Sequence, residues 1–206
     1  DRYSKQVLSG DLEGLRSFYM DRGYLDFKIN SSLIRISENK KHVYVDISLN
    51  EGNKYFFGES TISGKLNDDV SKEDLELQIG THKGEVFSRS QVTQTTGRMN
   101  QILGNKGYAF SNANAIPEVD KEGRTVSFNY FIDPGKKIYV RRINFYGNEK
   151  TKDSVIRREM RQFEASWYSK EKVDRSKSRL YNTQYFDQVD LEISSVAGVT
   201  DQVDAN

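Results

Sequence analysis

The chain contains no cysteine among its 206 residues. This absence excludes disulfide bonds, thiolate metal ligands and cysteine nucleophiles, and it fits an oxidising compartment as well as the cytosol. The chain also lacks an apolar run of about 18 residues, the length that a membrane-spanning helix needs. With 35% hydrophobic and 30% charged residues, however, it has enough apolar material for several small cores.

Residues that could support catalysis are also few. The chain has two histidines. Neither His42, on the polar face of an expected strand, nor His82, in an expected loop, has an evident acid or base partner. We find no HExxH motif and no carboxylate pair with the spacing of metal ligands. The segment 80–84 (GTHKG) lacks the GK[ST] ending of a phosphate-binding loop. We therefore expect a protein that is not an enzyme and that has no cofactor or metal site.

The charge balance gives no general reason to bind nucleic acid. Lys and Arg number 31 and Asp and Glu 30, so the net charge is +1. Divided after Gly52 and Gly135, the chain has 8 basic and 8 acidic residues in its first part, 9 and 11 in its second, and 14 and 11 in its third. Only the third part is positive, so a nucleic-acid-binding module stays open as an alternative on the evidence of Arg141, Arg142, Arg157, Arg158 and Arg161. Because the middle part is acidic and neither a GxxG loop between helices nor an RNP-like aromatic strand is present, we expect no nucleic-acid partner.

The sequence does contain an internal repeat. Gly52 and Gly64 recur as Gly135 and Gly147, each 83 residues later, and the pair Gly23-Tyr24 recurs as Gly107-Tyr108 after 84 residues. This period exceeds the roughly 20–50 residues of solenoid repeats and is long enough for each unit to have a small core of its own. We therefore predict tandem domains at 1–52, 53–135 and 136–206. Since the first begins in the middle of a unit, we expect the chain to be a piece of a longer protein.

The units are predicted to contain amphipathic helices. One apolar stripe recurs after 84 residues, first as Leu8, Leu12, Leu15 and Tyr19 and then as Val92, Thr96, Met99 and Leu103. Gly23 and Gly107 follow these stripes, as left-handed C-terminal caps do. Two further helices are expected to begin at Ser71, with Asp74 at N3, and at Thr151, with Asp153 in the first turn.

Strand patterns complete the unit. The segment 27–36 is expected to turn through 38–41 into a strand in which Val43, Val45, Ile47 and Leu49 face a core. The middle unit repeats this hairpin with a turn at 120–123 and inward-facing Val126, Phe128, Tyr130 and Ile132. Residues 55–63 and 138–146 read as first strands. The order is β-α-α-β-β, an α+β fold in which a three-stranded mixed sheet packs against two helices.

The last unit has two stripes in one predicted helix. Ile156, Met160 and Phe163 are expected to face the core. Arg157, Arg161 and Glu164 follow at the same spacing, about 100° around the helix. This second stripe is expected to face solvent or a partner.

Several of these features resemble polypeptide-transport-associated (POTRA) repeats, and most closely those of the outer-membrane assembly factors of Gram-negative bacteria. The resemblance rests on the element order, the Gly-Tyr pairs, the EG and DPG endings, and the segments 139–143 (YVRRI) and 155–161 (VIRREMR). It implies that residues 1–52 are the back half of a third repeat, 53–135 a fourth, and 136–206 a fifth whose last strand stops short at 203–206. One departure is Tyr185-Phe186, which stands where the other units have Gly-Tyr.

The resemblance also implies a function. Members of this group are periplasmic scaffolds, attached to the outer membrane through their own membrane β-barrel, that receive unfolded outer-membrane β-barrel proteins and dock accessory lipoproteins. By resemblance, Arg157 and Glu164 lie where the lipoprotein docks, and with Arg161 they form the candidate partner-binding site. POTRA domains of another system, in two-partner secretion or cell division, remain an alternative.

An exposed sheet edge offers a physical route to client binding. In a β-α-α-β-β unit the first strand of the hairpin is expected at the edge, where free backbone groups can pair with an extended peptide. Pro117 blunts this edge in the middle unit, because proline cannot donate to a ladder. The segment 27–36 has no proline. We therefore predict a client-binding edge strand with Phe27, Ile29, Ser31, Ser32, Leu33 and Ile34.

Overall fold

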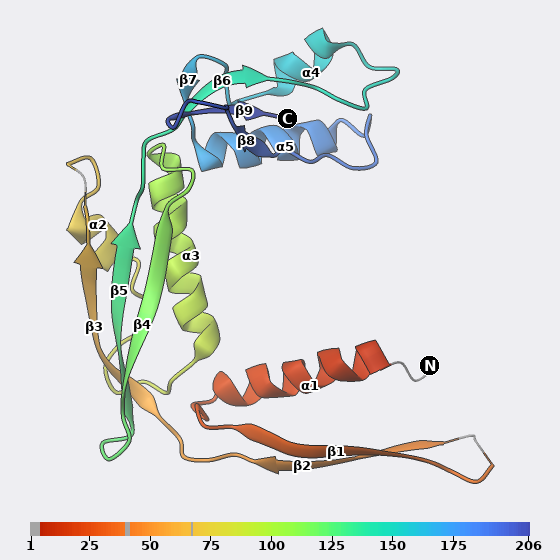
Figure 1. Cartoon of the computed structure of the whole chain (residues 1–206), viewed down its shortest axis with the longest axis vertical. Coiled ribbons are helices and arrows are strands. Elements are labelled where there is room, and N and C mark those ends of the chain that lie inside the picture. Colours follow the sequence, from red (N-terminus) through yellow and green to blue (C-terminus); the bar gives the residue numbers. More distant parts are fainter. Residues whose placement is uncertain (1–4, 40–41, 67) are drawn as a thin grey trace. The chain divides into compact units, whose positions relative to one another are not determined.

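The computed structural model of the chain describes residues 5–39, 42–66 and 68–206, except for the side chain of Lys5. Within these ranges the strands form three sheets, with the orders β1-β2, β3-β5-β4 and β7-β6-β9-β8 (Figure 1). Residues 40 and 41 of the predicted turn at 38–41 lie outside the described residues.

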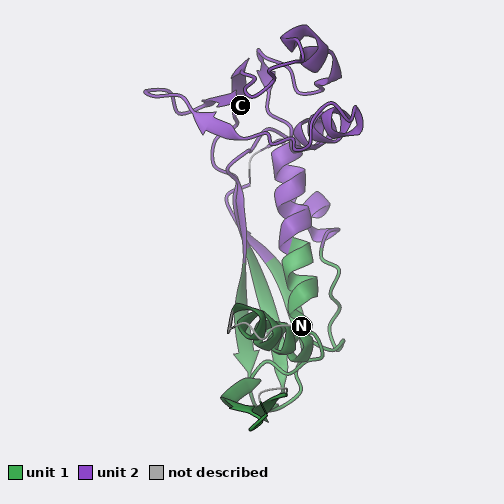
Figure 2. Cartoon of the chain, turned by 90° about the vertical axis from the view of Figure 1, so that its right-hand side faces the viewer, with its two compact units in different colours: residues 1–61, 79–95, 115–130 green, residues 62–78, 96–114, 131–206 purple. Residues whose placement is uncertain are grey.

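The chain divides into two compact units (Figure 2). One contains residues 1–61, 79–95 and 115–130, and the other contains residues 62–78, 96–114 and 131–206. The predicted junction at 52/53 lies inside the first compact unit and that at 135/136 inside the second. The two predicted domain junctions therefore stay a prediction, because neither of them coincides with a boundary between the compact units.

The first repeat consists of α1 (Lys5–Met20), β1 (Lys28–Ile36) and β2 (Val43–Asn50). Gly23 follows α1 with φ +98°, and the Tyr24 N–H donates to the Tyr19 carbonyl at 3.1 Å. At the end of α3, Gly107 has φ +105° and the Tyr108 N–H donates to the Leu103 carbonyl at 3.0 Å. Both predicted left-handed caps are confirmed.

The prediction of a buried face on the first hairpin was wrong. Ile34 pairs with Val45 and Ile36 with Val43, so their side chains share one apolar face. That face is largely open, because Val43, Val45 and Ile47 are 43%, 40% and 37% exposed. The described residues of this repeat supply two strands and one helix, whereas the hairpin of the middle repeat has a third strand beside it and two helices in the same repeat. The alternating pattern was correct, but the elements that cover such a face are missing here.

The middle repeat has the predicted elements in the predicted order. They are β3 (Phe56–Gly64), α2 (Lys72–Glu76), α3 (Arg89–Asn105), β4 (Asn112–Asp120) and β5 (Thr125–Asp133). Ser71 caps α2 and accepts the Asp74 N–H, while Asp120 closes the hairpin turn by accepting the N–H groups of Glu122 and Gly123. The inward side chains are buried as predicted, namely Val126, Phe128, Tyr130 and Ile132. β4 lies at the sheet edge and contains Pro117, also as predicted.

The last repeat contains β6 (Tyr139–Ile143), α4 (Asp153–Glu159), β7 (Ser166–Trp167), α5 (Lys170–Asn182), β8 (Ile193–Ser195) and β9 (Gln202–Ala205). β9 runs parallel to β6 and antiparallel to β8, so the sheet is mixed. Both helices contribute to the core, which includes Ile156, Met160, Val173, Leu180, Val140, Ile143, Val203 and Ala205. β8, the first strand of its hairpin, lies at the edge as β4 does.

Two details of the last repeat differ from prediction. The N-cap of α4 is Lys152, without a side-chain bond, and Asn148 holds the helix start instead by donating to the Thr151 carbonyl and to Asp153 Oδ1. β6 ends at Ile143, three residues before the predicted strand end. The departure at Tyr185-Phe186 agrees with the structure, because the left-handed residue after α5 is Gln184, with φ +58°, and not a glycine.

The helix α4 is also shorter than its sequence period suggests. Met160, its C-cap, has ψ 142°, which is extended backbone. Ile156 and Met160 are buried as predicted, but Phe163 lies beyond the helix and is 57% exposed. The prediction that Phe163 belongs to the core was therefore wrong, because the helix ends at Glu159 although the apolar period continues.

Candidate protein-docking site

Arg157 and Glu164 meet at the end of β6. Arg157 lies in the last turn of α4, and Glu164 lies in the loop between α4 and β7. Arg157 Nη1 is 3.1 Å from Glu164 Oε1. The same carboxylate oxygen accepts the Ile143 N–H at 2.8 Å, and Arg157 Nη2 donates to the Ile143 carbonyl at 3.1 Å. Together the two side chains satisfy both backbone polar groups of Ile143. This residue lies beyond the part of β6 that pairs with the short strand β7.

This pair is held firmly and is still accessible. The Ile143 N–H, and secondarily the Arg157 guanidinium, hold the pKa of Glu164 below its usual range. The guanidinium also lies 5.0 Å from the ring centroid of Phe145, within cation–π distance. The side chains of Arg157 and Glu164 remain 45% and 41% exposed. A binding partner can therefore reach a charged pair whose geometry is already set.

A hollow of about 300 Å³ adjoins the pair. It is lined by Ile143, Arg157, Met160, Gln162, Phe163 and Glu164. Exposed Phe163 thus lies beside a fixed arginine and a fixed carboxylate. Aromatic residues, phenylalanine included, and arginine are both enriched at protein interfaces.

Arg161 does not join this pair. Its guanidinium Nη1 donates to the carbonyls of Met160 and Arg158 at 2.9 and 3.3 Å. Its side chain lines a different hollow, of about 460 Å³, with residues of α5. The predicted single stripe of Arg157, Arg161 and Glu164 was therefore wrong, because the helix ends at Glu159 and the following turn sends Arg161 elsewhere.

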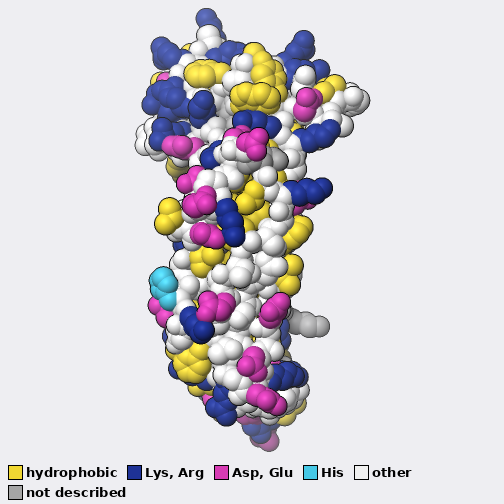
Figure 3. Space-filling view, turned by 90° about the vertical axis from the view of Figure 1, so that its left-hand side faces the viewer, with side chains coloured by type: hydrophobic (Ala, Val, Ile, Leu, Met, Phe, Trp, Pro, Cys, Tyr) yellow, Lys and Arg dark blue, Asp and Glu magenta, His cyan; other side chains and the backbone are white. Residues whose placement is uncertain are grey.

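The other arginines of the last repeat are engaged to different degrees. Arg141 forms a bidentate pair with Asp204, at 2.9 and 2.5 Å, which lowers the pKa of that carboxyl. Arg158 is 76% exposed and lies 3.9 Å from Glu159. Figure 3 shows Lys and Arg side chains gathered over the last repeat with hydrophobic side chains between them.

Comparison with known proteins fixes the family of this chain. The family model described as "POTRA: Surface antigen variable number repeat" matches residues 1–52, 55–135 and 138–205. The chain belongs to the POTRA family.

Relatives of this POTRA chain are assembly factors. The chain is 36% identical over 206 residues to the outer membrane protein assembly factor BamA of Neisseria meningitidis, covering all of the chain and 26% of that protein. It is 30% identical over 189 residues to BamA of Buchnera aphidicola, covering 92% of the chain and 30% of the relative. The crystal structure of Haemophilus influenzae BamA POTRA3-5 superposes with a TM-score of 0.90 at 30% identity, covering the whole chain and 80% of that structure. The chain thus spans under a third of these two full-length relatives.

The predicted edge strand of the first POTRA repeat is present, but Phe27 is not part of it. Phe27 precedes β1, is buried, and stacks on Tyr19 with ring centroids 4.3 Å apart. Ile29 and Ile34 are half-buried, and the remaining residues of the predicted set, Ser31, Ser32 and Leu33, are exposed. Phe27 therefore anchors the hairpin to α1 while the strand beyond it is open.

Hydrogen-bond parity identifies which backbone groups of β1 face its open edge. The Ser37 N–H donates to the His42 carbonyl at 3.0 Å, and Ile36 is opposite Val43, so Ser37 and His42 form a hydrogen-bonded pair. Such pairs alternate along an antiparallel ladder. The backbone groups of Ile36, Ile34 and Ser32 therefore point away from β2. These three residues offer the ladder positions that an added strand can use.

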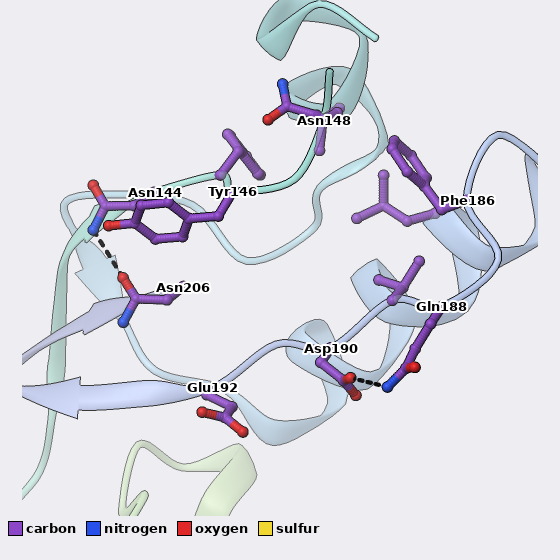
Figure 4. Close-up of a pocket in the computed structure, with 12 residues that line it drawn as sticks. Asn144, Tyr146, Asn148, Phe186, Gln188, Asp190, Glu192 and Asn206 are labelled. Carbon is purple, nitrogen blue, oxygen red and sulfur yellow. Dashed lines mark hydrogen bonds between the residues drawn. The ribbon is translucent and has the colours of Figure 1, made fainter. Parts of the chain in front are cut away.

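A further hollow, of about 310 Å³, lies in the last repeat beyond the end of β6 (Figure 4). Amide side chains line it, and two of them, Asn144 and Asn206, are joined by a hydrogen bond of 2.9 Å. Gln188 donates to Asp190 across the opposite wall (Figure 4). Nowhere in residues 5–39, 42–66 and 68–206 do three His, Cys, Asp or Glu side chains gather as a metal site. In the same part of the chain no helix combines the length and apolarity needed to cross a bilayer.

The residues that shape the loop between α4 and β7 were not predicted from the sequence. Ile143 was read as a strand residue, although its backbone organises the charged pair. Gln162 and Ser176 are polar residues with fully buried side chains, and no hydrophobic period marks them. The sequence carried no signal for their burial, because the apolar helical stripe continues through Phe163 and does not include Gln162.

Proposed function

We propose that this chain is the periplasmic part of an outer-membrane assembly scaffold, which receives unfolded outer-membrane β-barrel proteins and docks accessory lipoproteins. In the full-length protein it is attached to the outer membrane. The observation that carries the proposal is the similarity of the whole chain to POTRA domains of BamA. The chemistry of the described surface supports the proposal, because an accessible charged pair, Arg157 and Glu164, lies beside exposed Phe163 at the end of β6.

Lipoprotein docking is assigned to Arg157, Glu164 and exposed Phe163. A partner that presents a carboxylate to Arg157 and a cation to Glu164 extends the existing ion pair into a four-charge network, while Phe163 supplies apolar contact. Losing one member of a desolvated charged contact costs about 2–5 kcal/mol, whereas an exposed rim pair contributes about 0–1 kcal/mol. The size of the loss in a variant therefore reports how deeply the contact is buried.

Affinity of the full-length protein for its accessory lipoprotein tests this assignment. Arg157→Glu is expected to weaken binding at least tenfold, or about 1.4 kcal/mol. Glu164→Gln keeps an oxygen acceptor for the Ile143 N–H and removes only the charge. The matched control is Arg158→Glu, one residue further on the same helix and more exposed. Wild-type affinity in both Arg157→Glu and Glu164→Gln, with unchanged melting, would place docking elsewhere.

Client capture is assigned to the open edge of β1. An extended segment of an unfolded β-barrel protein can pair with the backbone groups of Ser32, Ile34 and Ile36, which requires no particular client sequence. The exposed apolar face of the same hairpin, with Val43, Val45 and Ile47, offers contact for the apolar side chains of such a segment. A carrier of many unrelated clients needs this kind of backbone recognition.

The alternatives have less support. Arg141 is paired with Asp204 and Arg157 with Glu164, which leaves less positive charge for a nucleic-acid backbone than the sequence suggested. A role in two-partner secretion or cell division would use the same fold with different binding partners. The identity with BamA proteins over the whole chain favours the assembly role over both.

A further inference from the structure

We infer that Gln162 is the positioning residue of the docking pair: it fixes the loop between α4 and β7, and so holds Glu164 against Ile143 and Arg157. The inference rests on the proposed docking function for its consequence, but its structural part can be tested without any partner.

Gln162 has an exposed fraction of 0% and lies at the centre of the loop. Its side-chain Nε2 donates to the Trp167 carbonyl at 3.1 Å and to Ser166 Oγ at 2.9 Å, with a third contact to the Phe163 carbonyl at 3.2 Å. Its Oε1 accepts the Ser169 N–H at 2.9 Å. One side chain therefore ties both sides of the segment 163–169, and its amide group is satisfied at both ends.

The helix α5 holds the beginning of the same loop. Ser176 Oγ accepts the backbone N–H groups of Arg161 and Gln162, at 2.8 and 3.1 Å, and donates to the Lys172 carbonyl at 2.7 Å. These bonds take the two N–H groups that would otherwise continue α4. They explain why the chain leaves the helix at Met160 and turns back toward β6.

The loop residues around Glu164 are held mainly by hydrogen bonds. Phe163, Glu164 and Ala165 are all exposed, so hydrophobic burial does not fix them. Ala165 has φ +55°, a left-handed conformation that is unfavourable for a non-glycine residue. Besides the Gln162 bonds, the Ala165 N–H donates to the Val140 carbonyl at 2.8 Å, Ser166 Oγ donates to the Phe163 carbonyl at 2.7 Å, and β7 pairs with β6. Gln162 is the buried side chain that bonds to residues on both sides of Glu164, so its loss removes the bonds that set the path of the loop there.

A buried glutamine is also a costly choice unless its geometry is needed. An amide without partners in an apolar site is destabilising, whereas an apolar side chain of similar size packs there without that requirement. The fully bonded amide instead specifies one loop conformation. We therefore assign Gln162 a positioning role and not a contact with the partner, since its side chain is inaccessible.

Amide hydrogen exchange in the full-length protein tests the structural part, using Gln162→Met with Gln188→Met, an exposed glutamine of the same repeat, as the matched control. In Gln162→Met the Ile143 amide, whose acceptor is Glu164, is expected to exchange at least tenfold faster. The Tyr139 amide, which donates to the Asp201 carbonyl at 2.8 Å in the same sheet, is expected to keep its rate. Lipoprotein affinity is expected to fall about as far as in Arg157→Glu. Gln188→Met is expected to change none of these quantities.

Unchanged exchange at Ile143 in Gln162→Met overturns the inference whatever the lipoprotein does. Faster exchange with unchanged affinity, while Arg157→Glu loses binding, also overturns it, because the loop would then be shaped without serving docking. If Arg157→Glu binds normally as well, the proposed docking function fails, and faster exchange still supports the positioning of Glu164. Should Gln162→Met not fold, Ser176→Ala removes the second anchor and is expected to show a smaller increase at Ile143; no increase there overturns the inference.

Discussion

The Gly107 carbonyl accepts the Ile138 N–H at 2.8 Å, and so joins the end of α3 to the first strand of the next repeat. The junction one repeat earlier has the same bond, from the Tyr55 N–H to the Gly23 carbonyl, also at 2.8 Å. In both places a lysine side chain lies over the glycine, so that an added Cβ would be 2.9 Å from Lys54 Cγ or 2.8 Å from Lys137 Cγ. The Gly-Tyr pair therefore has two roles: it caps a helix, and its glycine binds the beginning of the next repeat.

The first prediction concerns this glycine. Gly107→Ala is expected to lower the free energy of unfolding by about 1–2 kcal/mol, because alanine at positive φ is strained and its Cβ meets Lys137. Gly97→Ala, at an open position within α3, is expected to raise it by up to about 1 kcal/mol. Urea unfolding of both variants measures the difference. Equal stabilities would show that the close approach at the junction does not matter.

The second prediction concerns Asp69, which accepts bonds from Lys137 Nζ at 2.8 Å and from the Tyr108 hydroxyl at 2.6 Å. Lys137, and then Tyr108, lower the pKa of this carboxyl below its usual value of 3.8. A carboxyl whose pKa is lowered by folding stabilises the protein above its unfolded pKa, and this contribution is lost as the pH falls through the lowered value.

Asp69→Asn is therefore expected to destabilise the protein most at neutral pH and progressively less below about pH 4. Since Asp69 and Lys137 are both partly exposed, their ion pair is expected to contribute only about 0–1 kcal/mol, with about 1 kcal/mol more from the Tyr108 bond. Thermal unfolding between pH 3 and pH 7 measures the effect, with exposed Asp68→Asn as the control. A stability difference that grows toward low pH would contradict the assignment.

The third prediction concerns client capture at β1. Proline at Ser32 or Ile34 removes an N–H that points to the open edge and leaves the bonds to β2, so capture is expected to fall while the hairpin persists. Ser32→Ala keeps the N–H and is expected to capture clients normally. Site-specific photocrosslinking along 28–36 to an unfolded β-barrel protein, in the full-length protein, is the measurement. Equal crosslinking by folded Ser32→Pro and Ser32→Ala variants would rule out strand addition at this edge.

Local patterns predicted the elements whose partners are local or repeated. The apolar stripe and the Gly-Tyr pair gave the end of α3, because a left-handed cap depends on a few neighbouring residues. The alternation of Val126, Phe128, Tyr130 and Ile132 gave a buried strand face, since the middle repeat supplies every element that covers it. The same alternation failed in the first hairpin, where coverage depends on elements absent from the described residues.

Tertiary hydrogen bonds decided what local patterns could not. The helical period runs on through Phe163, but Ser176 takes the N–H groups of Arg161 and Gln162 and ends the helix at Glu159. The helical spacing predicted correctly that Arg157 and Glu164 lie together, but it placed both on one helix, and Glu164 lies outside α4. They meet through a loop that closes around Ile143, and that loop excludes Arg161.

In the function that we propose, the Arg157 and Glu164 pair docks a partner needed for outer-membrane protein assembly. The most direct measurement replaces the full-length protein in cells with Arg157→Glu or with Arg158→Glu and follows the amount of folded β-barrel protein in the outer membrane at equal scaffold levels. We expect a marked loss of folded β-barrel protein, with loss of lipoprotein co-purification, in Arg157→Glu and near-normal assembly in Arg158→Glu. Normal assembly in Arg157→Glu, or an equal loss in both variants, would contradict it.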